Sequence, residues 1–192
     1  MKKIFFILIV LIGLSTNINA QEIKRIVVGN INAKISIIAF ESMTCSHCAD
    51  FHKNVFPKLK EEYLDTGLAK IEFRHYPLDM AALNASKVSQ CKNDGNSDIL
   101  ESLYSNQQKW VKGSSVKEAN QNLQKFLKNQ GFKINFEECI NNKAIEDFIL
   151  NDRIEGTKTF KINSTPTIII NNEKFEKRLN YKNLKKALEK LI

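Results

Sequence analysis

The sequence has little of what marks disordered, fibrous or membrane-spanning chains. It contains only 7 glycines and 3 prolines among 192 residues, which excludes a collagen-like chain and argues against a disordered one. No apolar run reaches the roughly 20 residues that a transmembrane helix needs. Internal repeats, low-complexity segments and nucleic-acid-binding motifs are also absent. With 43% hydrophobic and 26% charged residues, the chain has the composition of a globular protein that can bury a core.

The first 20 residues have the pattern of a secretory signal peptide. Lys2 and Lys3 precede an apolar run at residues 4–14, and a polar stretch then leads to Ala20. An uncleaved anchor or a first core helix is the alternative interpretation of this segment. The signal-peptide interpretation predicts export of the protein and removal of residues 1–20.

The formal net charge of +8 raises the question of an acidic partner such as nucleic acid. The lysines, however, are spread along the whole chain and do not gather in a stripe. This distribution is typical of a solvated basic surface. We therefore expect no nucleic-acid partner.

The four cysteines form an even set in a chain that is expected to meet an oxidising compartment. Cys45 and Cys48 are separated by only two residues, so the most economical pairing joins them and leaves Cys91 with Cys139. A four-cysteine zinc site is the alternative, but such sites usually offer two close pairs, and Cys91 and Cys139 are far apart in sequence. The spacing favours two disulfides and no metal.

Cys45 follows a predicted strand and begins a predicted helix. Residues 34–40 form an isoleucine-rich run typical of a buried strand, and residues 41–44 make the turn after it. Apolar side chains then recur every three or four residues, as on one buried helix face: Cys48, Phe51, Val55, Leu59 and Tyr63. Pro57 lies inside this pattern, so we expect the helix to kink or restart there.

The start of a helix changes the chemistry of a cysteine. Its unpaired N–H groups and partial positive charge favour thiolate over thiol, and His47 can add positive charge or a hydrogen bond. We therefore predict a lowered pKa for the Cys45 thiol, with Cys48 one turn deeper and placed to displace what Cys45 captures. A purely structural disulfide is the alternative to this redox pair. His52 and His75 are interpreted as packing or surface residues.

The rest of the chain predicts an α/β fold interrupted by a block of helices. Strands are expected at residues 68–76 and 167–170, and Asn171-Asn172 fits a tight turn into a last strand at 173–177. Helices are expected at residues 81–91, 99–111, 117–129, 136–141, 144–154 and 181–191. Pro166 stands at the head of a strand, where it lacks the ladder N–H. A cis bond would account for it, but the local sequence favours an ordinary trans turn.

In this order and spacing, the motifs resemble the DsbA-like branch of the thioredoxin-fold superfamily over nearly all of the chain after residue 20. The matching segments are Val28–Ala33, Cys45–Cys48, Tyr76–Asp79 and Ser164–Thr167. The resemblance implies a thioredoxin fold with an inserted, mostly helical domain. The expected division is a signal peptide at 1–20, thioredoxin-fold parts at 21–79 and 151–192, and the helical insertion at 80–150.

The resemblance also implies roles for the site residues. Cys45 accepts the mixed disulfide and Cys48 resolves it. Pro166 is cis and lies against the Cys45 sulfur, while the backbone of Thr165 aligns a substrate strand by β-augmentation. The Cys91–Cys139 pair is the counterpart of a structural disulfide that some relatives carry in the helical cap.

Several positions depart from the family pattern. Ser46 and His47 support the site, but Ser46 stands where the best-known DsbA has proline, and Thr165 replaces its valine. Many relatives have an acidic residue at the position of Ala39. Glu41, two residues later, is expected to point to the same face of the extended segment and so to substitute for it.

The resemblance implies a periplasmic thiol:disulfide oxidoreductase that needs no cofactor and donates the Cys45–Cys48 disulfide to reduced or unfolded exported proteins. A membrane quinone reductase resembling DsbB is the expected partner for reoxidation, and the chain is expected to act as a monomer. One alternative is a disulfide isomerase or reductase of the same fold. The other is a client-binding chaperone with an incidental redox pair.

Overall fold

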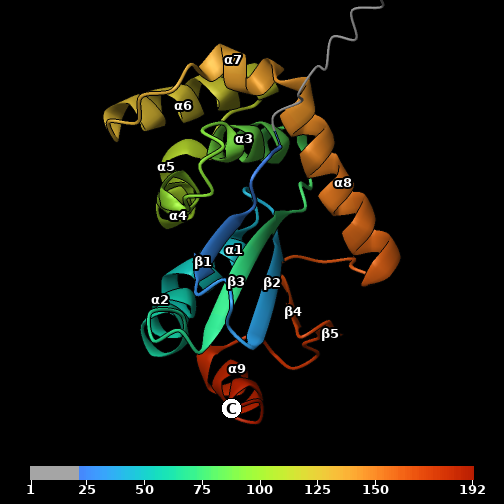
Figure 1. Ribbon diagram of the computed structural model, residues 1–192. Coiled ribbons are helices and arrows are strands. Elements are labelled where there is room, and N and C mark those ends of the chain that lie inside the picture. Colours follow the sequence, from blue (N-terminus) through green and yellow to red (C-terminus); the bar gives the residue numbers. More distant parts are fainter. Residues whose placement is uncertain (1–21) are drawn as a thin grey trace, which may run out of the picture.

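The computed structural model describes residues 22–192, so the signal peptide predicted at residues 1–20 lies outside the described residues. Within this range the chain forms a five-stranded sheet with the order β1-β3-β2-β4-β5 (Figure 1). Its strands are β1 (Ile26–Gly29), β2 (Ile35–Glu41), β3 (Ala69–His75), β4 (Thr167–Ile170) and β5 (Glu173–Lys174). β2 and β3 are parallel, and the other neighbouring pairs are antiparallel.

The three central strands agree with the sequence-based prediction to within one residue at each end. Asn171 and Asn172 have φ angles of 46° and 69°, the left-handed conformations that a tight hairpin turn requires, so the predicted turn is confirmed. β5 is shorter than expected, because it ends at Lys174 and not at Lys177. β1 was not predicted from the sequence, because four residues are too few to show the period of a strand. Its position depends on its pairing with β3.

Helices α1 (Ser46–Asn54) and α2 (Phe56–Leu59), a π-helical turn (Lys60–Leu64) and α9 (Tyr181–Leu188) complete the thioredoxin-like part of the chain. Pro57 lies in the first turn of α2, which confirms the predicted restart of the helix. Strand alternation gives β2 two buried faces: Ile37 and Ala39 join the main core, while Phe40 belongs to a separate cluster.

The second face of β2 is covered by α8 (Lys143–Thr159). Gly156 allows this close approach, because a Cβ there would lie 2.8 Å from a ring carbon of Phe40. α8 is longer than predicted and runs without a break through residue 150. No helix end therefore marks the expected boundary between 150 and 151, and the proposed domain division stays a prediction.

Five further helices form a cap at one end of the sheet (Figure 1). They are α3 (Met80–Gln90), α4 (Asp98–Ser105), α5 (Gln107–Trp110), α6 (Val116–Asn129) and α7 (Phe136–Asn141). The single helix predicted at residues 99–111 is wrong, because Asn106 leaves the helical conformation (φ −123°, ψ 22°) and separates α4 from α5. The buried Trp110 holds α5 against α4, since its indole N–H donates to the Leu103 carbonyl at 2.8 Å.

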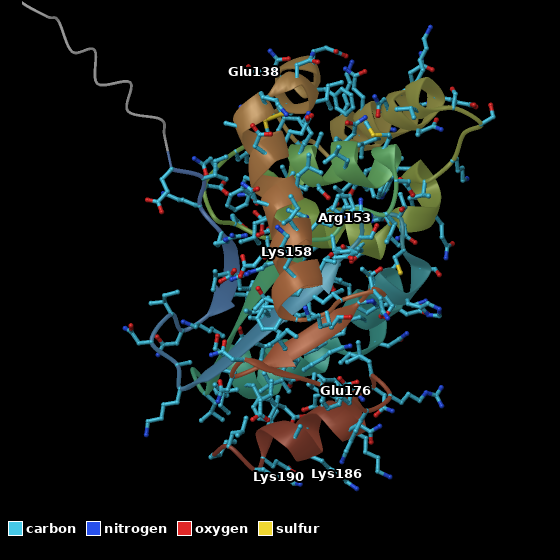
Figure 2. All side chains as sticks on the ribbon, turned by 90° about the vertical axis from the view of Figure 1, so that its right-hand side faces the viewer. Glu138, Arg153, Lys158, Glu176, Lys186 and Lys190 are labelled. Carbon is cyan, nitrogen blue, oxygen red and sulfur yellow. A yellow bond between two sulfur atoms is a disulfide. The ribbon has the colours of Figure 1, made fainter. Side chains whose placement is uncertain are left out.

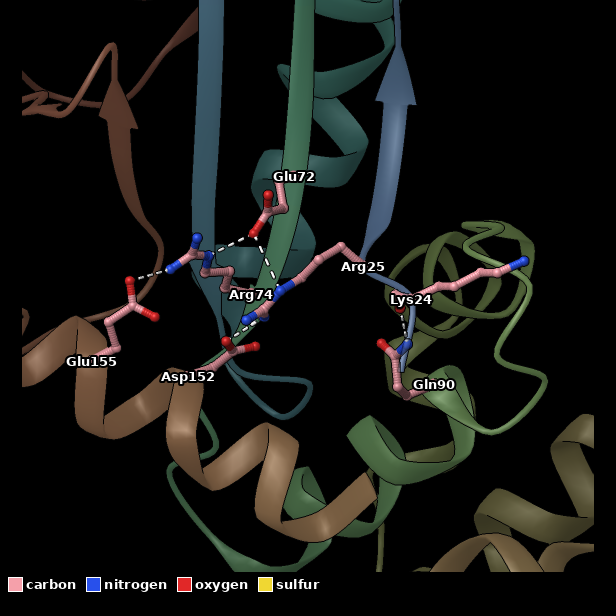
Figure 3. Close-up of polar contacts among 7 residues, drawn as sticks. All are labelled: Lys24, Arg25, Glu72, Arg74, Gln90, Asp152 and Glu155. Atoms are coloured by element: carbon pink, nitrogen blue, oxygen red, sulfur yellow. Dashed lines mark hydrogen bonds and ion pairs between the residues drawn. The ribbon is translucent and has the colours of Figure 1, made fainter. Parts of the chain in front are cut away.

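Charged side chains tie the start of the described chain to the sheet and to α8 (Figure 3). Arg25 pairs with the buried Asp152 and lies 3.6 Å from Glu72. Arg74 bridges Glu72 and Glu155 at 2.6 and 2.7 Å. The pairs stand on β3, α8 and the segment before β1, so they fix three elements that are far apart in sequence.

The surface carries charges of both signs, and α8 alone holds Lys143, Glu146, Arg153 and Glu155. Figure 2 shows Arg153 and Lys158 on α8, Lys186 on α9, Lys190 just after that helix, and Glu138 on α7 of the cap. Within residues 22–192, no helix is both long enough and apolar enough to cross a membrane.

Candidate active site

Cys45 lies between the end of β2 and the start of α1. Its N–H donates to the Ser42 carbonyl at 3.0 Å, and its own carbonyl accepts from the N–H groups of Cys48 and Ala49 at 3.1 and 3.2 Å. Cys45 is therefore the N-cap residue of α1, with an extended backbone. This confirms its predicted place at the start of a helix and puts its sulfur near the positive end of the helix dipole.

The surroundings of the Cys45 sulfur favour the thiolate. The pKa of the thiol falls from its ordinary value of 9.0 to about 5. The largest cause is a hydrogen bond from the Cys48 thiol, and partial burial opposes it. The backbone N–H groups of Cys48 and His47 lower the pKa further. At neutral pH the accessible Cys45 side chain is therefore a thiolate, which is the nucleophilic form of cysteine.

Cys48 has the opposite character. Its side chain is 0% exposed, and burial raises the pKa of its thiol. The hydrogen bond to Cys45 and the negative charge of Glu41 add to this rise. Both cysteines are free thiols in the structure. The two sulfurs of the C-x-x-C motif are therefore unequal: one is accessible and ionised, and the other is buried and protonated.

The Thr165–Pro166 peptide bond is cis, so the trans turn expected from the local sequence is wrong. The Cys45 thiol donates to the Thr165 carbonyl at 3.3 Å. The Thr165 hydroxyl is buried and has no hydrogen-bond partner among the described residues. The local sequence could not show this arrangement, because the contact joins residues 120 positions apart.

Ser46 and His47, the residues between the two cysteines, are both exposed. His47 acts on the Cys45 thiolate through its backbone N–H. A further contribution from the His47 imidazole stays a prediction, as does a specific role for the Ser46 hydroxyl.

Sequence reasoning missed the pairing of Glu41 with His52 beneath the cysteines. Glu41 Oε2 lies 2.8 Å from His52 Nε2, and both side chains are buried. Burial raises the pKa of the Glu41 carboxyl, and His52 partly offsets the rise. The imidazole also stacks on the ring of Tyr104, with centroids 4.1 Å apart. One signal was available, since His52 follows Cys48 by four residues and so shares its helix face.

Gln107 and Asp79 form hydrogen bonds that hold the turn carrying Cys45. Gln107 donates through Nε2 to the carbonyls of Met43 and Cys45, each at 2.9 Å. On the other side, the Thr44 hydroxyl donates to Asp79 Oδ2 at 2.7 Å. Sequence reasoning could not find the Gln107 contacts, because they depend on how the cap packs beside α1.

Cys91 and Cys139 form a disulfide in the cap, with Cα atoms 5.4 Å apart. Its yellow bond is visible close to Glu138 in Figure 2. The bond joins the C-terminal end of α3 to α7. Because these two sulfurs bind each other, the alternative of a four-cysteine zinc site does not fit the structure.

Comparisons with known proteins agree with this architecture. A family model described as Thioredoxin matches residues 21–190. The crystal structure of Wolbachia pipientis alpha-DsbA1 is 31% identical, with a TM-score of 0.77, and the match covers 87% of this chain and 90% of that one. The Disulfide bond formation protein D of Bacillus subtilis is 25% identical over 85% of this chain and 75% of its own length.

A Rickettsia bellii protein named as a protein-disulfide oxidoreductase is 27% identical over 86% of this chain. The match covers only 64% of the Rickettsia protein, so the chain spans less than two thirds of that relative's length. The family-model match, the alpha-DsbA1 similarity and the geometry around Cys45 lead to one conclusion. The chain belongs to the DsbA-like family of the thioredoxin fold.

Proposed function

We propose that this protein is a thiol:disulfide oxidoreductase that donates the Cys45–Cys48 disulfide to reduced, unfolded exported proteins. The observation that carries the proposal is the inequality of the two sulfurs. Cys45 is accessible and has a pKa of about 5, whereas Cys48 is buried and has a raised pKa. A disulfide made from such a pair is a strong oxidant, because its reduced form is stabilised by the Cys45 thiolate.

The exchange proceeds in two displacements. A client thiolate attacks Cys45 Sγ, the Cys45–Cys48 bond breaks, and the Cys48 sulfur leaves with the electron pair. Cys48 then takes up a proton, as its raised pKa requires. A second client thiolate attacks the client sulfur of the mixed disulfide and releases Cys45 as a thiolate. The client loses two electrons and gains a disulfide, and the enzyme ends as the dithiol.

The proton that Cys48 takes up must come from a group inside the protein, because the Cys48 side chain does not reach solvent. Glu41 is the carboxyl whose charge acts on Cys48, and burial keeps the pKa of that carboxyl raised. Glu41 thereby takes the place of the acidic residue that is missing at Ala39. We assign it the role of holding or releasing this proton.

Client binding is assigned to the backbone beside Pro166. The Thr165 carbonyl lies against the Cys45 sulfur, where an extended client segment can pair with main chain and be accepted whatever its sequence. Leu78 and Met80 are 52% and 54% exposed in the segment that contacts Ser42 and Thr44. Such exposed apolar side chains favour clients that have not yet buried their own.

The proposal has four further parts. The protein is exported through residues 1–20, is located in the periplasm, acts as a monomer and is reoxidised by a DsbB-like membrane quinone reductase. Reoxidation restores the disulfide: the dithiol passes the two electrons that it took from the client to the membrane protein and on to quinone. The names of the Rickettsia and Bacillus relatives, which refer to disulfide oxidoreduction and disulfide bond formation, support the thiol:disulfide oxidoreductase activity.

The direct test compares the oxidised protein with its Cys45→Ala variant. The parent protein is expected to form disulfides in a reduced test protein, and the variant is expected to be inactive because no sulfur remains for the client to attack. Good repair of scrambled disulfides, together with an ordinary Cys45 pKa, would instead identify an isomerase. Protection of an unfolded client from aggregation that persists without either cysteine would identify a chaperone.

A further inference from the structure

Gln107 is a buried amide from the cap that contacts the turn carrying Cys45. It is the first residue of α5 and is 9% exposed. Its Nε2 atom lies 2.9 Å from the Met43 carbonyl and 2.9 Å from the Cys45 carbonyl. A primary amide nitrogen carries two hydrogens, so one side chain satisfies both acceptors. A carboxylate or an apolar side chain of the same length would satisfy neither.

The Cys45 carbonyl that Gln107 holds is also the first acceptor of α1. It receives the N–H groups of Cys48 and Ala49, which close the first turn of the helix. The orientation of this peptide therefore decides how the helix N-terminus is presented to the Cys45 sulfur. A hydrogen bond that fixes the orientation of the Cys45 carbonyl therefore also fixes the position of the Cys45 sulfur relative to the helix N-terminus.

The helical turn that carries Gln107 is packed into the cap. Trp110 of the same helical turn is 1% exposed and is bound to the Leu103 carbonyl. α5 also packs against α6. Gln107 thus reaches the active site from the cap, whereas both cysteines of the motif stand on the thioredoxin-like part.

We propose that Gln107 is a positioning residue for the attacking thiol. It fixes the turn from Met43 to Cys45, so that the sulfur keeps its place beside the helix N-terminus and the Thr165 carbonyl. Gln107 acts through the main chain and does not touch the reacting sulfur. The inference rests on the proposed function, because it concerns the reactivity of Cys45.

The test uses the reduced full protein and Gln107→Met, which keeps the length of the side chain and removes both donors. The titration midpoint of Cys45, followed by thiolate absorbance, is expected to rise by about one pH unit. The redox equilibrium with glutathione is expected to move about tenfold toward a weaker oxidant. Gln107→Asn keeps the amide on a shorter side chain and is expected to shift both readouts in the same direction, should the methionine variant fail to fold.

Asn84→Leu is the matched control. Asn84 is 8% exposed and donates to Asn120 Oδ1 at 2.9 Å, so the variant removes an equally buried amide from the cap away from the cysteines. It is expected to lower thermal stability and to leave the Cys45 midpoint unchanged.

Two results would overturn the inference: a Gln107 variant that loses stability but keeps the parent midpoint, or an Asn84→Leu variant that shifts the midpoint as much. An ordinary Cys45 midpoint in the parent protein itself would instead refute the proposed function.

Discussion

The two cysteine pairs of this protein are chemically alike but lie in different surroundings. Cys45 and Cys48 lie one helical turn apart, with one sulfur accessible and the other buried. Cys91 and Cys139 join two cap helices across a sequence separation of 48 residues. The comparison indicates why the first pair is suited to exchange and the second to a structural role.

Chain entropy explains one part of the difference between the two cysteine pairs. A bridge that encloses two residues removes little freedom from the unfolded chain, so breaking and re-forming it costs the fold little. A bridge across 48 residues removes much more and has a structural effect. The surroundings of the sulfur explain the other part, because the Cys45 thiolate accepts a hydrogen bond from the Cys48 thiol and lies at a helix N-terminus.

The most severe way to break the active pair without removing the attacking sulfur is Cys48→Ala. This variant keeps Cys45 reactive but has no second sulfur to form the internal disulfide or to release a captured partner. We expect catalytic oxidation of a reduced test protein to fall to background. With a disulfide-containing peptide, a mixed disulfide at Cys45 is expected to accumulate and to be visible by mass spectrometry. Oxidation close to that of the parent would show that the Cys45–Cys48 disulfide is not the oxidant.

The corresponding change in the other pair is Cys91→Ala with Cys139→Ala. The chain-entropy relation predicts a loss of roughly 4 kcal/mol in the free energy of unfolding for a loop of this length. Denaturant unfolding of the oxidised protein measures it. The folded variant is expected to keep the oxidation rate of the parent at 25 °C, because the cap disulfide does not take part in exchange. An unchanged unfolding midpoint would contradict the structural role.

What the sequence predicted correctly depends on neighbours along the chain. The helix start at Cys45, the restart at Pro57 and the turn at Asn171 each follow from a few adjacent residues and their backbone preferences. The pairing of Cys91 with Cys139 followed by elimination, once the closer pair had been assigned to itself.

What the sequence did not predict depends on contacts between distant segments. Gln107 reaches Cys45 across 62 positions, and Glu41 meets His52 only because β2 and α1 pack together. The break between α4 and α5 at Asn106 interrupts a pattern that is periodic on both sides. Such features need tertiary structure, and propensity alone does not encode them.

A pH series sharpens the comparison, because Cys45 is the one cysteine of the two pairs whose thiol titrates in this range. A group whose pKa is lower in the folded than in the unfolded chain stabilises the fold fully above its unfolded pKa and loses that effect as pH falls through its folded pKa. Cys45, with a pKa of about 5 against 9.0, is such a group. Cys48 stays protonated throughout this window, because burial raises its pKa.

The oxidised protein has no Cys45 thiol. We therefore expect the Tm of the reduced form, measured relative to the oxidised form, to rise as pH increases from about 5 toward 9. Calorimetry of both forms across this range measures the difference, and the cap disulfide, present in both, cancels. A difference that does not change with pH would mean that the Cys45 thiolate is not stabilised by the fold.

The mildest change leaves all four sulfurs in place and alters only the charge beneath the active pair. Glu41→Gln keeps a side chain that can bind His52 and removes the negative charge that acts on Cys48. Because the reduced form carries a thiolate at Cys45, losing a nearby negative charge favours that form, and we expect a severalfold stronger oxidant in the glutathione equilibrium. An unchanged glutathione equilibrium would mean that the charge of Glu41 does not act on the Cys45 thiolate, and that the inequality of the two sulfurs has other causes.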